Sequence, residues 1–200
     1  MLVIASNYVF SAVRLHRRNK KSFLCNKEKQ QLFESVCEEL KIPAGRVKLR
    51  QNYHVITAEF MGILHPQVIL PVKEFSKAEL RTIFVHELVH YKQRDIYLKC
   101  LAMLVLVFHY FNPMAWKLSK TVCRWSEYAC DERACGMVGG TIVYFNNLLT
   151  MAESTWQKKC HFAVGLMEHK NELEERIEHL RKINKVKKKS VWFAIFLSCV

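Results

Sequence analysis

The sequence contains no Cys-x-x-Cys pair, although it has eight cysteines in 200 residues. Thiolate zinc sites and small disulfide-rich folds both depend on closely spaced cysteines, so their spacing here argues against either class. Several of the cysteines have apolar neighbours or lie in segments with helical periodicity. We therefore predict buried thiols in a reducing compartment, which agrees with a cytoplasmic location.

Internal repeats and a phosphate-binding glycine loop are also missing. Gly136, Gly139 and Gly140 lack the spacing of such a loop and instead predict the end of a helix. Half of the residues are hydrophobic and 24% are charged, which is the composition of a folded chain rather than a disordered one. A chain of 200 residues suits one domain with a sizeable core better than two.

Acidic residues are too few to balance the basic ones, with 18 Asp and Glu against 31 Lys and Arg and a net charge of +13. Such an excess is typical of proteins that bind nucleic acid, an anionic membrane surface or an acidic partner. Much of it lies in two clusters, residues 14–21 and 185–189, next to the apolar ends of the chain. Cations on the inner side of both apolar segments follow the positive-inside rule, which places the residues between them in the cytoplasm.

Neither apolar end reaches the roughly 20 residues that a helix needs to cross a bilayer. We expect residues 1–13 to be the end of one transmembrane helix and residues 190–200 to be the start of another, both cut from a longer membrane protein. Residues 14–189 would then form the cytoplasmic domain. The alternative is that both ends are frayed or interfacial segments of a soluble protein.

Hydrophobic periodicity predicts an α+β fold with a small N-terminal sheet and a mainly helical remainder. Ser76 and Glu79 have the spacing of a capping box, and Asn112-Pro113 predicts a second helix start. The predicted strands are residues 46–50, 55–60 and 67–70. The predicted helices are residues 27–40, 96–111, 113–135, 142–154 and 170–184, together with the helix that begins after Ser76.

The helix that follows Ser76 contains an HExxH motif, His86-Glu87-Leu88-Val89-His90. Side chains four residues apart project from the same helix face, so both imidazoles can bind one metal ion. Glu87 lies beside them and can accept a proton from the water that the metal activates. Apolar residues around the motif predict a buried helix, which disfavours two ordinary surface histidines.

A catalytic zinc site needs a third protein ligand and an open position for water. Glu127-Tyr128-Ala129-Cys130-Asp131 has the Glu-x-x-x-Asp pattern of the thermolysin-like zinc peptidases. By this resemblance, Glu127 is the third ligand and Asp131 hydrogen-bonds a metal-bound histidine, for which we choose His86. The alternative is an ordinary surface helix with two acidic residues.

These motifs, with Arg94-Asp95 and the segment from His109 to Trp116 between them, resemble the BlaR/MecR-type membrane metallopeptidases. Some members of that family sense β-lactam antibiotics. The resemblance spans about residues 47–200 and implies a zincin-like domain, one Zn²⁺ per chain and a place on the cytoplasmic side of the bacterial inner membrane. It also implies hydrolysis of a cytoplasmic protein, which in the sensor members is a transcriptional repressor or the peptidase itself. Signal transduction and antibiotic resistance are therefore expectations from the family.

The stretch from Cys100 to Trp116 carries no formal charge and is near the lower length limit of about 17 residues for a membrane helix. If it crossed the bilayer, His86 and Glu127 would lie on opposite sides and could not bind one metal ion. We therefore predict a helical hairpin that is either buried or in contact with the membrane.

The residue that stabilises the oxyanion stays open, with Tyr144 and His161 as candidates and His109, His169 and His179 as further ones. The expected partners are a protein or peptide substrate, membrane lipid through the flanking helices and a second copy of the chain. No direct contact with nucleic acid is expected.

Three other functions compete with a signalling peptidase. A housekeeping peptidase for membrane-protein quality control would carry the same metal pattern. A basic module that binds membrane or DNA around a structural metal would explain the charge, but a structural site does not need Glu87. A degenerate peptidase that serves as a scaffold is disfavoured by the intact motifs.

Overall fold

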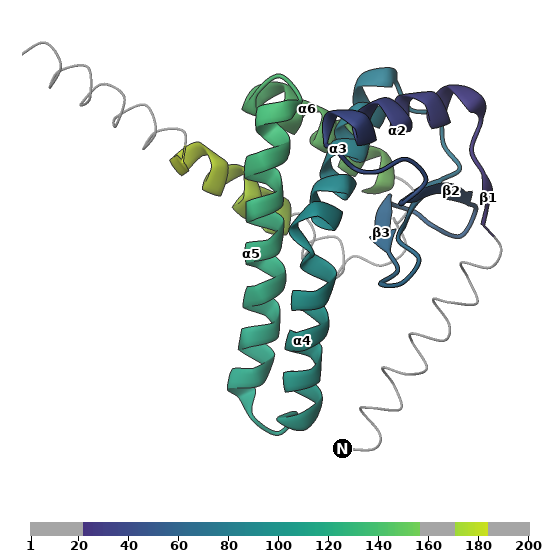
Figure 1. Cartoon of the computed structure of the whole chain (residues 1–200). Coiled ribbons are helices and arrows are strands. Elements are labelled where there is room, and N and C mark those ends of the chain that lie inside the picture. The colour runs from purple at the N-terminus through teal and green to yellow at the C-terminus, as the bar shows by residue number, and fades with distance from the viewer. Residues whose placement is uncertain (1–21, 157–170, 184–200) are drawn as a thin grey trace, which may run out of the picture. The chain divides into compact units, whose positions relative to one another are not determined.

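The structure, a computed structural model, describes residues 22–156 and 171–183. They have the predicted α+β organisation, with a small sheet early in the chain followed by helices (Figure 1). The chain divides into two compact units, residues 1–126 and 127–200, and the boundary lies inside helix α5 (Pro113–Met137). Among the described helices, none combines the length and the apolar character needed to cross a membrane. The two predicted membrane segments lie outside the described residues.

A four-stranded mixed sheet forms part of the first unit. Its strands are arranged in the order β1 (Phe23–Leu24), β2 (Lys48–Asn52), β4 (Gln67–Pro71) and β3 (Glu59–Met61). The central strands β2 and β4 are parallel, and the two outer pairs are antiparallel. Val68, Ile69 and Leu70 of β4 are fully buried, as expected for a central strand covered on both faces.

The strand predictions have mixed outcomes. The predicted strand at residues 67–70 is confirmed, and the one at residues 46–50 lies two residues further along the chain as β2. The prediction for residues 55–60 is wrong over residues 55–58, which form no strand. Val55 is apolar because its side chain is buried in the core, not because its backbone belongs to the sheet. The two-residue strand β1 is too short to produce an alternating pattern and was not predicted.

Helix α3 (Lys77–Gln93) lies against the sheet and against α2 (Lys27–Glu39), where the Phe33 and Phe84 rings meet edge to face at 5.2 Å. The predicted capping box is confirmed. The Glu79 backbone N–H donates to Ser76 Oγ at 3.2 Å, and the Ser76 N–H donates to the Glu79 carboxylate at 2.7 Å. Every residue of α3 from Thr82 to His90 is buried, so the metal motif belongs to a core helix.

Helices α4 (Asp95–Phe108) and α5 form a hairpin within the first unit. Four residues, 109–112, connect them, and Asn112 caps α5 by accepting a hydrogen bond from the Met114 N–H at 2.9 Å. At the other end, the Ser126 hydroxyl donates to Asp95 Oδ2 at 2.8 Å. Because both ends of α4 are joined to α5, the two helices run antiparallel, which confirms the predicted hairpin (Figure 1).

In the second unit, α5 ends before two glycines with positive φ, Gly139 (95°) and Gly140 (105°), as predicted. Helix α6 (Thr141–Trp156) follows directly, and residues 171–183 form a further helix. Both agree with the helices predicted at residues 142–154 and 170–184. Within the described residues all six cysteines are free thiols, and burial raises the pKa of Cys37 to about 11.

We expect Gly62→Ala to destabilise the protein more than Gly45→Ala. Both glycines have positive φ, which costs an alanine about 1–2 kcal/mol. A Cβ on Gly62 would also meet the His65 carbonyl oxygen at 2.2 Å in the turn between β3 and β4, whereas a Cβ on Gly45 meets nothing within 4 Å. Urea unfolding of the two variants measures the difference in the free energy of unfolding. Equal losses of stability would show that the β3–β4 turn adapts to a Cβ at residue 62 with no energetic cost.

Candidate metal centre

The HExxH motif places two imidazoles on one face of α3. The Nε2 atoms of His86 and His90 lie 3.2 Å apart, and their rings meet edge to face with centroids 4.7 Å apart. Both side chains are buried, at 9% and 7% exposed. Because the rings are one helical turn apart, their Nε2 atoms can converge on one point beside the helix.

This geometry fits a tetrahedral metal ion. Two imidazole nitrogens at about 2.0–2.1 Å from zinc, separated by the tetrahedral angle, lie about 3.3 Å from one another. The 3.2 Å found between the two Nε2 atoms is close to that separation. Neutral imidazole is among the commonest zinc ligands, so the donor chemistry fits as well.

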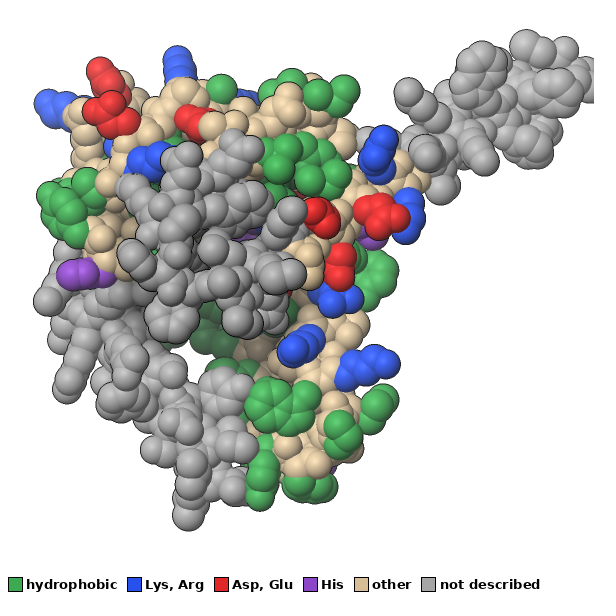
Figure 2. Space-filling model, turned by 180° about the vertical axis from the view of Figure 1, so that it is seen from behind, with side chains coloured by type: hydrophobic (Ala, Val, Ile, Leu, Met, Phe, Trp, Pro, Cys, Tyr) green, Lys and Arg blue, Asp and Glu red, His purple; other side chains and the backbone are tan. Residues whose placement is uncertain are grey.

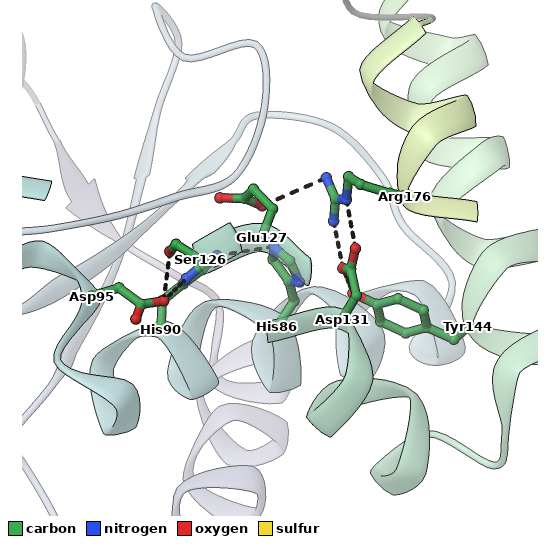
Figure 3. A network of polar contacts seen from close by, with 8 residues as sticks. All are labelled: His86, His90, Asp95, Ser126, Glu127, Asp131, Tyr144 and Arg176. Atoms are coloured by element: carbon green, nitrogen blue, oxygen red, sulfur yellow. Dashed lines mark hydrogen bonds and ion pairs between the residues drawn. The ribbon is translucent and has the colours of Figure 1, made fainter. Parts of the chain in front are cut away.

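Asp95 orients His90. The Nδ1–H of His90 donates to Asp95 Oδ2 at 2.6 Å, and the Ser126 hydroxyl donates to the same oxygen at 2.8 Å (Figure 3). Both side chains of the His90–Asp95 pair are 8% exposed, so water screens the contact little. With a proton held on Nδ1 by Asp95, His90 directs its Nε2 atom toward His86.

A left-handed residue at the junction of α3 and α4 places Asp95 in contact with His90, five residues earlier in the chain. Arg94 has φ 59° and ψ 31°, a left-handed conformation that ends α3 and immediately precedes α4. Asp95 is then the first residue of α4, where a negative charge also interacts favourably with the helix dipole. An acidic residue five positions after the second motif histidine was the sequence signal for this role, but helical spacing alone does not predict the contact.

Glu87, the predicted proton acceptor, lies on α3 between the two histidines in sequence and is 8% exposed. Its neighbours on the helix are apolar, and Leu88 is fully buried. The carboxylate is therefore held in a largely dry environment, which suits a group that exchanges a proton with a reacting water.

In the second unit, Asp131 is the centre of a separate polar network (Figure 3). The Arg176 guanidinium donates to its two oxygens at 2.6 Å each, and the Tyr144 hydroxyl donates to Oδ1 at 2.6 Å. Arg176 Nη1 also lies 3.6 Å from Glu127 Oε2. A buried carboxylate is costly unless it is paired, and Asp131, at 1% exposed, has a bidentate ion pair and a hydroxyl donor.

The charges of this network shift the pKa values of its members. Burial and the Asp131 carboxylate raise the pKa of Tyr144 well above its usual value. Burial would lower the pKa of Arg176, but its hydrogen bonds and charge interaction with Asp131 outweigh that effect and raise it. Tyr144 and Arg176 therefore remain protonated donors to Asp131 over the whole physiological pH range.

The structure also describes some of the residues predicted to stabilise the oxyanion or to orient a metal ligand. The single hydroxyl proton of Tyr144 is engaged with Asp131, so an oxyanion role stays a prediction that requires this hydroxyl to leave its acceptor. The predicted hydrogen bond between Asp131 and His86 also stays a prediction. His179 stacks on the Tyr128 ring at 4.1 Å, and His109 is exposed after α4. His161 and His169 lie outside the described residues.

Three residues of these networks had no assigned role in the sequence: Asp95, Ser126 and Arg176. Asp95 and Ser126 are 31 residues apart, and Asp131 and Arg176 are 45 apart. No local periodicity joins positions so distant in the chain.

Comparisons with known proteins agree on one protein family. A family model described as BlaR1 peptidase M56 matches residues 1–180. The regulatory protein BlaR1 of Bacillus licheniformis is 32% identical over 108 residues. That alignment covers 53% of this chain and 18% of the BlaR1 protein, so the chain spans less than a fifth of this relative's length.

We expect Asp95→Asn to weaken metal binding by about 10–100-fold, because a neutral amide holds the Nδ1–H of His90 less well than a carboxylate. Competition with a chelating dye gives the zinc affinity. Glu38→Gln, which removes an exposed carboxylate from α2, serves as the matched control and should bind zinc like the wild type. Unchanged affinity in Asp95→Asn would mean that Asp95 does not hold a metal ligand.

Proposed function

The chain belongs to the BlaR1 peptidase M56 family, and from that premise we propose that it is a zinc-dependent metalloendopeptidase. The observation that carries the proposal is the convergent pair of Nε2 atoms on α3, 3.2 Å apart, of which one belongs to a ring held by Asp95. This arrangement orients two metal ligands before the metal binds. A structural histidine pair would not need the buried Glu87 between them.

His86, His90 and Glu127 would hold the ion. Ser126, the residue before Glu127 on α5, is bonded to Asp95, which in turn holds His90. The attachment of α5 at the position preceding Glu127 supports this residue as the third ligand. Arg176, 3.6 Å from Glu127 Oε2, would restrain the orientation of that carboxylate.

A zinc ion bound there would lower the pKa of a water molecule and polarise the substrate carbonyl. Glu87 would accept the proton of that water and later transfer it to the leaving amine. Strand β3 is an edge strand of the sheet and lies next to α3, where the Phe60 and Tyr91 rings are 5.8 Å apart. Its backbone would align an extended substrate by strand pairing.

The family and the charge pattern support a proposal for the substrate class and the location. We infer a protein substrate on the cytoplasmic side of a bacterial inner membrane, which is a transcriptional repressor, the peptidase itself or both. The description of the Bacillus licheniformis relative as a regulatory protein supports a signalling role. The cationic clusters at residues 14–21 and 185–189 support the cytoplasmic side.

The metal content of Glu127→Ala tests the ligand set. Wild type should retain one zinc ion per chain after dialysis, and Glu127→Ala should lose it or bind it much more weakly, because the site then has two protein ligands. Elemental analysis measures both.

Cys130→Ser is the matched variant for this experiment. Cys130 is buried, lies three residues after Glu127 on α5 and so projects from the same side of the helix, and a thiolate is also a good zinc ligand. The proposal requires full zinc content in Cys130→Ser. Zinc lost from Cys130→Ser and retained by Glu127→Ala would assign the third ligand to the thiol instead.

Glu87→Gln separates catalysis from metal binding. The amide has the shape of the carboxylate but accepts no proton, so cleavage of fluorescently labelled casein should fall by about 10²-fold or more. Zinc content should stay at the wild-type level. An active Glu87→Gln variant, or one that has lost its zinc, would remove Glu87 from the proposed role.

A further inference from the structure

The α4–α5 hairpin carries large apolar side chains that are not buried in the fold. Exposed fractions reach 49% for Leu98, 58% for Leu101, 52% for Leu104 and 62% for Phe108. Phe111, in the connection between the two helices, is 73% exposed. Hydrophobic side chains gather at the free end of the hairpin, with Lys and Arg side chains further from that end (Figure 2). An apolar surface of this extent usually marks a binding site.

The exposed side chains extend around much of α4. Successive residues are about 100° apart around a helix, so Ala102 and Leu106, which are buried, share one narrow side. Met103, Leu104 and Leu101, all at least 38% exposed, project in other directions that together cover nearly half of the circumference. A groove on a protein partner covers one face of a helix, whereas lipid acyl chains surround it.

The first half of α5 is divided into three faces. Ala115 and Ser126 are buried toward the fold. A neighbouring face is apolar and exposed, with Met114 at 65%, Leu118 at 47% and Trp125 at 58%. A third face is cationic and consists of Lys117, Lys120 and Arg124.

The charges of the hairpin have one sign. No Asp or Glu occurs between Asp95 and Glu127, whereas four basic residues do. A helix with an apolar face containing Trp and Leu and a separate Lys and Arg face is typical of segments that lie in the interface of an anionic membrane.

We propose that the α4–α5 hairpin inserts its free end and apolar faces into the acyl layer of an anionic phospholipid bilayer, with the cationic face of α5 at the headgroups. At 1.5 Å per residue α4 is about 21 Å long, shorter than the hydrocarbon core of about 30 Å. The hairpin therefore enters from one side and returns to it. The opposite end of the hairpin, where Asp95 holds His90, stays outside the acyl layer, so insertion holds the metal helix α3 close to the membrane surface. This attachment does not depend on peptidase activity and is separate from the apolar ends of the chain.

A lipid crosslinking experiment on the full chain tests the hairpin locally. The protein is reconstituted into vesicles of phosphatidylcholine and phosphatidylglycerol that contain a phosphatidylcholine with a diazirine on its acyl chain. After illumination, the peptides that carry lipid adducts are identified by mass spectrometry. Adducts within residues 97–118 are expected. Adducts at the chain ends without any in this segment would overturn the proposal, as would crosslinks from the hairpin to a second copy in their place.

Two variants make the test quantitative. The double variant Leu101→Glu with Leu104→Glu should lower the adduct yield on the hairpin about tenfold or more, because carboxylates resist entry into the acyl layer. Ile63→Glu with Leu64→Glu, which adds the same charge to side chains 45% and 81% exposed in the β3–β4 connection, should leave that yield unchanged. Equal yields in wild type and the Leu101/Leu104 variant would contradict insertion.

The cationic face has its own test. Reversing Lys117, Lys120 and Arg124 to Glu should lower the hairpin adducts about tenfold in anionic vesicles and much less in vesicles of phosphatidylcholine alone. The same loss in both vesicles would show that these residues do not act through anionic headgroups. All three side chains are exposed, so the substitutions leave the core of the hairpin intact.

Discussion

The hydrogen bond between His90 and Asp95 is the contact on which the described part of the candidate metal centre depends. Without a partner at Nδ1, the imidazole of His90 could rotate about its terminal side-chain torsion, and its proton could occupy either ring nitrogen. Asp95 removes both freedoms, because it accepts the Nδ1 proton at 2.6 Å in a site that is 8% exposed. The same oxygen accepts the Ser126 hydroxyl, so one buried carboxylate joins the end of α3, the start of α4 and the middle of α5.

The second unit uses the same principle with a different set of partners. Asp131 is nearly inaccessible, and a charge in such a place is stable only when its oxygens are satisfied. Arg176 and Tyr144 provide three short hydrogen bonds, and the network fixes the part of α5 that carries Glu127. Each unit therefore contains a buried carboxylate whose partners restrain a candidate metal ligand, His90 in one and Glu127 in the other. Mutation of such partners commonly lowers metal affinity by about 10–100-fold.

The proposed insertion of the hairpin would connect the proposed chemistry with the membrane. At the end next to α3, Asp95 and Ser126 are hydrogen-bonded to one another, and Asp95 also holds His90 of α3. At the free end, where residues 109–112 connect the two helices, Phe108, Phe111 and Met114 are exposed. One end of the hairpin is polar and has its hydrogen bonds satisfied, and the other end is apolar and exposed. This arrangement agrees with the proposed action of a peptidase at a membrane surface. Hydrogen bonds of the polar end would keep the histidine helix in a constant position relative to the membrane.

The sequence by itself determined the features that depend on residues close together along the chain. Residues four apart on a helix share a face, so the spacing of His86 and His90 was sufficient to predict their convergence, and the Ser76–Glu79 and Asn112 caps were predicted for the same local reason. The tertiary structure alone decided that Asp95 returns to His90 through a left-handed Arg94, and that Arg176 pairs with a carboxylate 45 residues away. It also decided between a buried and an exposed hairpin, because an apolar side chain such as Leu101 looks the same in the sequence whether or not other elements cover it. Contacts between distant segments depend on how the helices pack, and neither periodicity nor composition contains that information.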